Sequence, residues 1–343
     1  MSYQRPSTIL VACWMRRAES TGRGAARLKF ISRPGSLERF PVRECRLIDG
    51  RTGVMQPSRD QIERAAYDRW ERRGRFHGAD REDWIAAEMD LTFDLNYKTV
   101  AEYSLCEPKP RVLGNEKRPK CRFCEQGPPR AAFSVVRFAV PEVTGNTSLK
   151  TREVCDECTE QFAKSIDAAF AKFWESLQPL RGPTSSFREL RLPTAITIPA
   201  YKALVRMALT IMPESELPSF TDTIEWVTNP DHEFDSKLFE GAGSLIYRTH
   251  VPYTQGWTSL AQRIEDDAPF PFVQYFLAVD SLIIQIHLPL CARDEDLDGS
   301  EVRLPERSFS TGLGSNYQSS TCLVLPLKTS AEQSRPRRFR LFW

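Results

Sequence analysis

Four of the nine cysteines stand in two pairs that share one spacing. Two residues separate Cys121 from Cys124, and two separate Cys155 from Cys158. This spacer lets both thiolates of a pair reach one tetrahedral ion, and two pairs complete a four-cysteine site. In a reducing compartment the pattern indicates zinc more often than disulfides. We therefore expect these four cysteines to hold a structural Zn²⁺, with redox-active or merely structural thiols as the alternative.

The residues that accompany the two pairs form a second pattern. They are Pro141-Glu142, Gly145-Asn146 and Leu149, followed by the second pair itself. In order and spacing they resemble the HNH endonuclease family in its zinc-knuckle form. In that family the two pairs bracket a β-hairpin that is followed by a helix. The resemblance therefore implies a ββα-metal module, which we place at residues 106–178.

Two positions depart from the family pattern. Phe138 stands where the family has its general-base histidine, and Thr159 stands where it has an asparagine after the second pair. In the family mechanism the histidine deprotonates a water that attacks the phosphate, and a divalent ion stabilises the developing charge. Phenylalanine can do neither, and loss of a general base alone lowers a rate by a factor of about 100 to 10,000. We expect phosphodiester hydrolysis to be impaired or absent.

An active endonuclease with a rearranged site is the alternative interpretation. Its catalytic residues would be Glu142, Asn146 and Asp156, which could bind a second divalent ion, Mg²⁺ or Mn²⁺, beside the structural zinc. None of the four histidines lies within the motif. The sequence therefore leaves enzymatic activity undecided.

The distribution of charge favours a partner that carries phosphate. Residues 1–60 contain twelve Arg and Lys against five Asp and Glu, whereas residues 211–300 contain four against sixteen. A separated basic end indicates a phosphate-bearing partner, and internal docking of acidic on basic surface is the alternative. Beside the cysteine pairs, the candidates for neutralising phosphates are Arg122, Arg130, Arg137, Lys150 and Arg152.

These patterns give three functional hypotheses. The first is a degenerate HNH-like zinc protein that binds nucleic acid, with DNA as the expected form. The second is the active endonuclease. The third is a zinc-stapled scaffold for protein interactions, whose partner would be a second copy of the chain or a protein from the same operon. No uninterrupted apolar run approaches the roughly 20 residues of a membrane span, and we expect a cytoplasmic protein without a membrane partner.

Residues 58–95 carry the periodicity of a helical hairpin. Ser58 and Gln61 fit a capping box at the start of the first helix, and a glycine turn at Gly74 precedes the second helix. The spacing of aromatic, glycine and alanine residues from Ala66 to Glu88 closely resembles a short uncharacterised bacterial domain. That resemblance implies no chemistry.

The remaining sequence divides by composition. We expect a basic N-terminal segment at residues 1–57, either small β or poorly ordered, a C-terminal α+β domain at 187–328 and a basic tail at 329–343. At the end of the zinc module, an apolar face predicts one long helix over about residues 158–178. The predicted fold class is α+β, with a ββα-metal zinc module between an N-terminal helical hairpin and a C-terminal α+β domain.

Overall fold

The computed structural model describes most of the chain from residue 54 onward. The described residues are 54–117, 119–181, 189–229, 243–297, 304–312, 314, 317–328 and 337–340. All of them belong to one unit of the chain, Phe40–Trp343. The expectations for residues 1–53, and for the basic tail apart from 337–340, lie outside the described residues.

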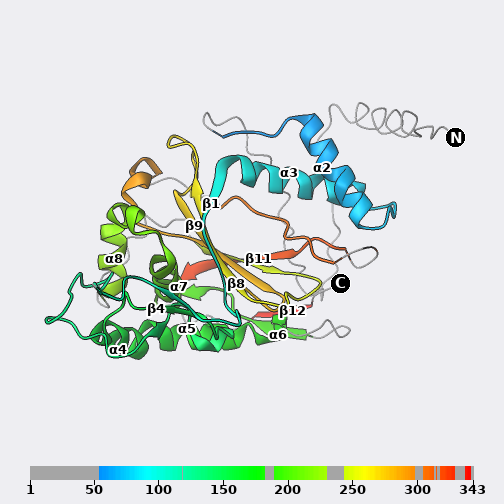
Figure 1. The fold of residues 1–343 in the computed structure, drawn as a ribbon. Helices are drawn as coiled ribbons and strands as arrows, with labels where there is room; N and C mark the ends of the chain where they lie inside the picture. The colour runs from blue at the N-terminus through cyan, green and yellow to red at the C-terminus, as the bar shows by residue number, and fades with distance from the viewer. Residues whose placement is uncertain are drawn as a thin grey trace. The chain divides into compact units, whose positions relative to one another are not determined.

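A seven-stranded mixed sheet lies at the centre of this unit (Figure 1). Its strand order is β1-β8-β9-β10-β7-β11-β6. All neighbours pair antiparallel except β11 and β6, which pair parallel through Leu327 and Lys328. The strands are β1 (Tyr97–Ser104), β6 (Ile196–Thr197), β7 (Gly243–Arg248), β8 (Trp257–Arg263), β9 (Val273–Val279), β10 (Leu282–His287) and β11 (Thr321–Lys328).

Both faces of this sheet are covered by other elements. Along β9, Tyr275 and Leu277 belong to one hydrophobic cluster, and Phe276 and Ala278 belong to another. Because both sets are buried, the strand is an unbroken apolar run from Tyr275 to Val279 instead of an alternation of apolar and polar residues. The sheet is therefore a middle layer, with a separate core on each side.

Helix α7 (Ile198–Ile211) covers the first face and is the most deeply buried helix of the described chain. Every residue from Ala200 to Ile211 is buried, since α7 packs on strands β8, β10 and β11 on one side and on helix α5 on the other. Helix α8 (Thr221–Thr228) packs beside it. At the end of β10, His287 is fully buried, and the Tyr201 hydroxyl from α7 donates to its carbonyl oxygen at 2.8 Å.

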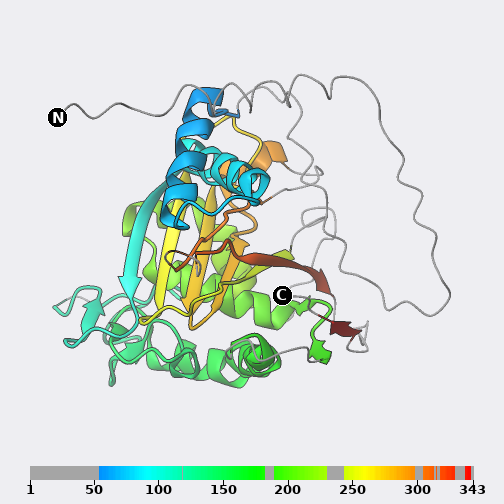
Figure 2. The ribbon, with the colours of Figure 1, turned by 90° about the vertical axis from the view of Figure 1, so that its right-hand side faces the viewer.

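Helices α4 (Asp156–Lys164), α5 (Ile166–Ser176) and α6 (Gln178–Arg181) lie beyond α7 from the sheet (Figures 1 and 2). The apolar face expected here is confirmed as buried, but the expected single helix is interrupted at Ser165. The Ser165 hydroxyl donates to the Gln161 carbonyl oxygen at 2.7 Å. Such a bond from a serine side chain to the carbonyl group four residues earlier competes with the backbone hydrogen bonds of a helix and bends it. The spacing of apolar residues does not reveal this bend.

Helices α2 (Arg59–Arg72) and α3 (Asp80–Asn96) form the hairpin on the opposite face of the sheet (Figure 2). Both bonds of the Ser58–Gln61 capping box are present, as the sequence predicted. α3 contributes Phe93 to the second core, where its ring meets Phe276 edge-on at a centroid distance of 5.7 Å. The hairpin is thus packed on the sheet.

Two small sheets complete the fold. β2 (Arg111–Leu113), β4 (Leu149–Thr151) and β3 (Arg137–Phe138) form one, in the order β2-β4-β3, and β5 (Glu189–Leu192) pairs with β12 (Arg337–Arg340) in the other. The predicted α+β class is confirmed. None of the described helices is long and apolar enough to cross a membrane.

Candidate metal centre

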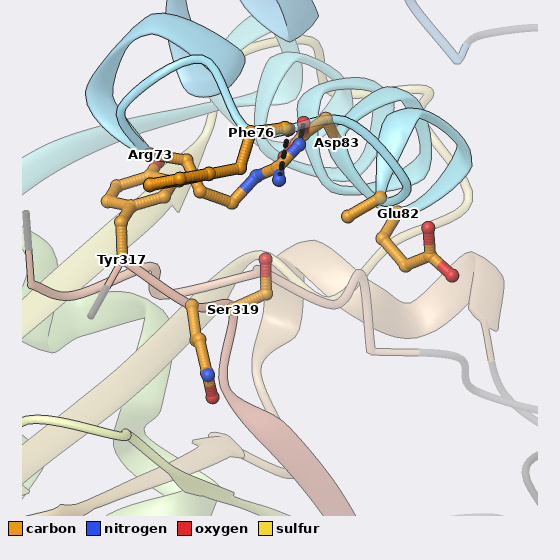
Figure 3. A pocket seen from close by; sticks show the side chains of 8 residues that line it. Arg73, Phe76, Glu82, Asp83, Tyr317 and Ser319 are labelled. Carbon is orange, nitrogen blue, oxygen red and sulfur yellow. Dashed lines mark hydrogen bonds and ion pairs between the residues drawn. The ribbon is translucent and has the colours of Figure 1, made fainter. Parts of the chain in front are cut away.

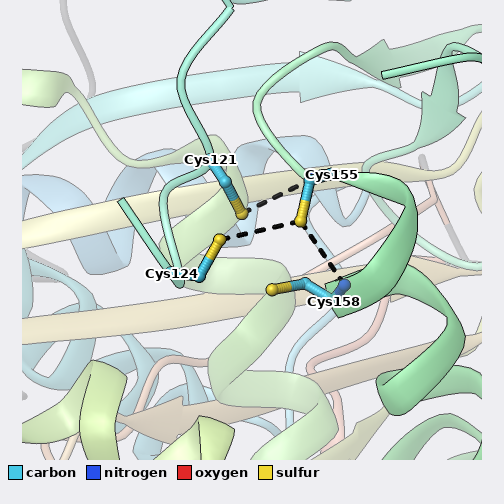
Figure 4. A group of neighbouring side chains, drawn as sticks. All are labelled: Cys121, Cys124, Cys155 and Cys158. Carbon is cyan, nitrogen blue, oxygen red and sulfur yellow. Dashed lines mark hydrogen bonds between the residues drawn. The ribbon is translucent and has the colours of Figure 1, made fainter. Parts of the chain in front are cut away.

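The four paired cysteines come together in one cluster (Figure 4). Their sulfur atoms all lie within 4.8 Å of one another, and the Cys124 and Cys155 sulfurs are 3.7 Å apart. A tetrahedral zinc with Zn–S bonds of about 2.3 Å sets its sulfurs about 3.8 Å apart. The predicted clustering is confirmed, and its geometry is compatible with a structural zinc ion.

Local backbone structure positions each thiol. Cys121 and Cys124 flank a turn between β2 and β3, Cys155 is the N-cap of α4, and Cys158 lies in the first turn of that helix. The Cys121 sulfur accepts from the Cys155 amide at 3.5 Å, and the Cys155 sulfur accepts from the Cys158 amide at 3.4 Å. Such amides stabilise the thiolate form that a metal requires.

The thiols hold their protons unequally. The hydrogen bond from Cys158 lowers the pKa of Cys121 to about 4, and the same bond raises the pKa of Cys158. Burial raises the pKa of Cys155 to about 11. A dication that binds all four sulfurs must displace the retained protons, so loading is favoured as the pH rises.

The structure places two strands and a helix around this cluster. β3 and β4 pair antiparallel, with Arg137 opposite Thr151 and Phe138 opposite Lys150, and α4 begins five residues after β4 ends. The two cysteine pairs thus bracket β3 and β4. β2 adds a third strand, parallel to β4.

Asn146, a candidate catalytic residue, is buried in the turn that precedes β4. Its side-chain nitrogen donates to the carbonyl oxygens of Val140 and Leu149 at 2.7 and 2.9 Å. Its side-chain oxygen accepts from the amides of Ser148 and Leu149. Backbone groups therefore engage the whole amide, which holds the turn in place.

Glu142 and Asp156, the other two candidates, have different surroundings. Glu142 is exposed at the start of a short 3₁₀ helix. Asp156 accepts from the Ser134 amide at 2.9 Å and pairs with Arg137 at 3.2 Å, and the bonds from Ser134 lower its pKa. Among the described residues, the four cysteines are the one group of three or more His, Cys, Asp or Glu side chains close enough to share an ion.

The two positions that depart from the family pattern are also well defined. Phe138 is half-buried, with the Lys150 ammonium 5.0 Å from its ring centroid. The Thr159 hydroxyl donates to the Cys155 carbonyl oxygen at 2.9 Å. The position of the family's histidine is thus taken by a phenyl ring that lies beside an ammonium group, which donates hydrogen bonds and accepts none.

Arg122 fastens the metal cluster to the central helix. Its guanidinium binds the Glu153 carboxylate at 2.6 and 2.7 Å, and it also donates to the Leu209 and Met212 carbonyl oxygens at the end of α7. Arg122 is one of the predicted phosphate ligands, but its guanidinium is engaged within the protein, by a contact that the sequence did not predict. The sequence does hold one indication of it: Arg122 lies within the first cysteine pair and Glu153 lies two residues before the second, so opposite charges are expected to meet where the pairs do.

The other basic candidates are more accessible. Arg137 pairs with Asp156, and Arg152 pairs with Glu116 at 3.2 Å. Arg130 is exposed and Lys150 is half-buried. Within the part of the chain that the structure describes, neither has a carboxylate partner.

Comparison with known proteins reaches only the hairpin. A family model described as "Protein of unknown function (DUF2934)" matches residues 57–92, which are α2 and most of α3. No curated protein matches the chain, and no solved structure does. The matched segment is the one that resembled a short bacterial domain in sequence.

The hairpin also lines a pocket of about 500 Å³ (Figure 3). One wall carries the ion pair between Arg73 and Asp83, at 2.6 Å. The Asp83 carboxylate neutralises the charge of Arg73, so the arginine that lines this pocket is already paired. The lining residues are Arg73, Phe76, Ala79, Glu82, Asp83, Tyr317, Gln318 and Ser319.

Replacing one ligand tests the metal centre. We expect the purified chain to contain one zinc per molecule and Cys155→Ser to lower zinc affinity about 100-fold or more, because each thiolate supplies a large share of the binding free energy. Metal content after dialysis against a chelator of known affinity measures the change. The matched control is Cys322→Ser, at an exposed cysteine outside the cluster; equal zinc retention in the two variants would contradict a four-cysteine site.

Removal of Arg122 tests the link to α7. We expect Arg122→Ala to lower the free energy of unfolding by about 3–5 kcal/mol, because the mostly buried Glu153 then loses its partner. Urea unfolding of zinc-loaded protein measures it. Arg152→Ala, whose pair with Glu116 is exposed, is the control, with an expected loss within about 1 kcal/mol. Similar losses of unfolding free energy in both variants would show that the Arg122 contact stabilises the protein no more than an exposed ion pair does.

Proposed function

We propose that residues 106–178 form an HNH-like module that holds a structural Zn²⁺ and binds nucleic acid, DNA in the first place, with impaired or absent phosphodiester hydrolysis. The observation that carries the proposal is the meeting of four thiols, two from a turn between β2 and β3 and two from the start of α4. One ion at that point would clamp two strands and a helix together.

The arrangement around the thiols supports the HNH-like interpretation. The order is a cysteine pair, β3, β4, a second pair and α4, which is the order that the sequence resemblance implies. Cys121, Cys124, Cys155 and Cys158 would be the zinc ligands, and the ion would supply a fixed cross-link between the elements. The chain's own residues then set the surface that those elements present.

Unpaired positive charge supports a phosphate-bearing partner. Arg130 and Lys150 stand on the module without carboxylate partners among the described residues, and Arg137 and Arg152 form pairs that are open to solvent. Surface pairs of this kind contribute little energy and can exchange for a phosphate. Arg122, held inside the molecule, is not included in this set.

The surroundings of Phe138 support weak or absent hydrolysis. A phenyl ring cannot accept the proton of an attacking water, and the side chain that lies over it is the ammonium of Lys150. The rearranged endonuclease gains no support from Asn146, whose amide is engaged by four backbone bonds. Glu142 and Asp156 remain the groups that such a site would need.

Reversing charge on the module tests the binding. We expect zinc-loaded protein to bind a labelled DNA duplex with an affinity that falls steeply with salt, because bound phosphates release counterions. The Arg130→Glu and Lys150→Glu double variant should bind more weakly and with a shallower salt slope, by about one unit per lost contact. Fluorescence anisotropy at several salt concentrations measures both quantities.

The control for this experiment is Arg64→Glu with Arg81→Glu, two exposed arginines of the hairpin on the opposite face of the sheet. Equal weakening in both double variants would show only a general effect of net charge. Absence of salt-dependent binding of both duplex and single-stranded DNA by the wild type would overturn the proposal and favour the protein-interaction scaffold.

Restoring the histidine tests the loss of hydrolysis. We expect no plasmid nicking by the wild type with Mg²⁺ or Mn²⁺, and nicking by Phe138→His, since that change returns a base to the family position. Gel analysis of supercoiled plasmid measures the products. Cleavage by the wild type that is lost in Glu142→Ala or Asp156→Ala would instead establish the rearranged active site.

A further inference from the structure

We propose that the outward face of the β2-β4-β3 sheet is a platform for single-stranded nucleic acid, on which Phe138 stacks with an unpaired base and Lys150 meets a neighbouring phosphate. The platform is defined by Val112, Lys150 and Phe138. This inference rests on the proposed nucleic-acid binding and adds to it a surface of the module that takes unpaired bases.

The strand register sets these three side chains in one row. Val112 of β2 is opposite Lys150 of β4, and Lys150 is opposite Phe138 of β3. Directly opposed residues project to the same face of a sheet. On β4 the flanking Leu149 and Thr151 are buried, so the row at Lys150 is on the outward face.

Packing confirms that this row is not part of the core. Val112 is 41% exposed. Phe138 and Val112 contact none of the hydrophobic clusters, whereas the nearby Leu113 and Phe133 pack against the largest one. The half-buried Phe138 ring is therefore an aromatic surface outside the hydrophobic clusters of the described chain.

Lys150 acts as an exchangeable cover for that ring. Its ammonium lies 5.0 Å from the ring centroid, and it has no carboxylate partner within the described ranges. A cation over a solvent-accessible ring is held weakly, and stacking of a nucleobase on an aromatic side chain is stronger. A base can thus replace the ammonium, which then becomes available to a phosphate one step along the strand.

Charge and shape together favour a single strand over a duplex. Lys150 lies in β4, and Arg152 directly follows that strand. Their positive charges together complement a phosphate backbone. In a duplex both faces of each base are already stacked, so a flat ring on a sheet has no base to meet. The lost general base would then have been replaced by a binding group.

The test compares single-stranded and duplex probes on the zinc-loaded full chain. The probes are a labelled oligothymidine of 20 nucleotides and a duplex of the same length. We expect Phe138→Leu, which keeps an apolar side chain but removes the ring face, to weaken single-strand binding about 5- to 100-fold. Duplex binding should change less than about twofold, and Phe138→Trp should keep single-strand binding, since indole also stacks. The control is Phe76→Leu, at an exposed aromatic of the hairpin.

The outcomes separate this inference from the proposed function. Equal single-strand affinity in Phe138→Leu and the wild type, with zinc content unchanged, would overturn the platform and leave nucleic-acid binding in place. Weakening of both probes to the same degree would also overturn it, because the ring would then serve no special role for unpaired bases. Absence of binding to either probe by the wild type would remove the proposed function itself.

Discussion

The interaction of Arg122 with Glu153 and with the end of α7 is the contact that joins the cysteine cluster to the central helix. The last carbonyl groups of a helix have no partner within the helix, and a buried end must find donors elsewhere. Arg122 supplies them from inside the first cysteine pair, and Glu153 holds Arg122 in place from beside the second pair. Because α7 is the layer on which the central sheet packs, the position of the thiols and the termination of the central helix are mechanically linked.

This contact also divides the arginines of the zinc module into two kinds. In the sequence, Arg122, Arg137 and Arg152 look alike, since each lies near a cysteine pair and could meet a phosphate. In the structure one of them is 9% exposed and bonded within the protein, and the other two form pairs at the surface. Burial decides the difference: a buried guanidinium must be satisfied internally, whereas a solvated one can change partners at little cost.

Features encoded by local spacing were predictable, and features that depend on distant pairing were not. The Ser58 capping box and the apolar face of α4 and α5 follow from residues a few positions apart. The four-thiol cluster follows from two pairs that each have such a local spacing and together complete one tetrahedral ligand set. By contrast, β1 was assigned to no domain, yet it pairs with β8 more than 150 residues later. The interruption at Ser165 depends on one hydroxyl, and the Arg122 contact depends on the placement of α7. Neither feature produces a repeating pattern of apolar residues, which is the signal from which secondary structure is predicted.

The attachment of the helical hairpin limits how the chain can be divided. The matched family segment stops at residue 92, but α3 continues to Asn96. Phe93, the first residue after the matched segment, already belongs to the core on one face of the sheet. On the other helix, the buried Arg69 pairs with Asp90 and donates to Ser308, more than two hundred residues away. A fragment of residues 57–92 would lack Phe93, which packs α3 on the sheet, and its buried Arg69 would lose the Ser308 hydroxyl. In this chain the segment that matches the family model is therefore not expected to fold alone. A fragment made for expression should contain both the hairpin and the central sheet.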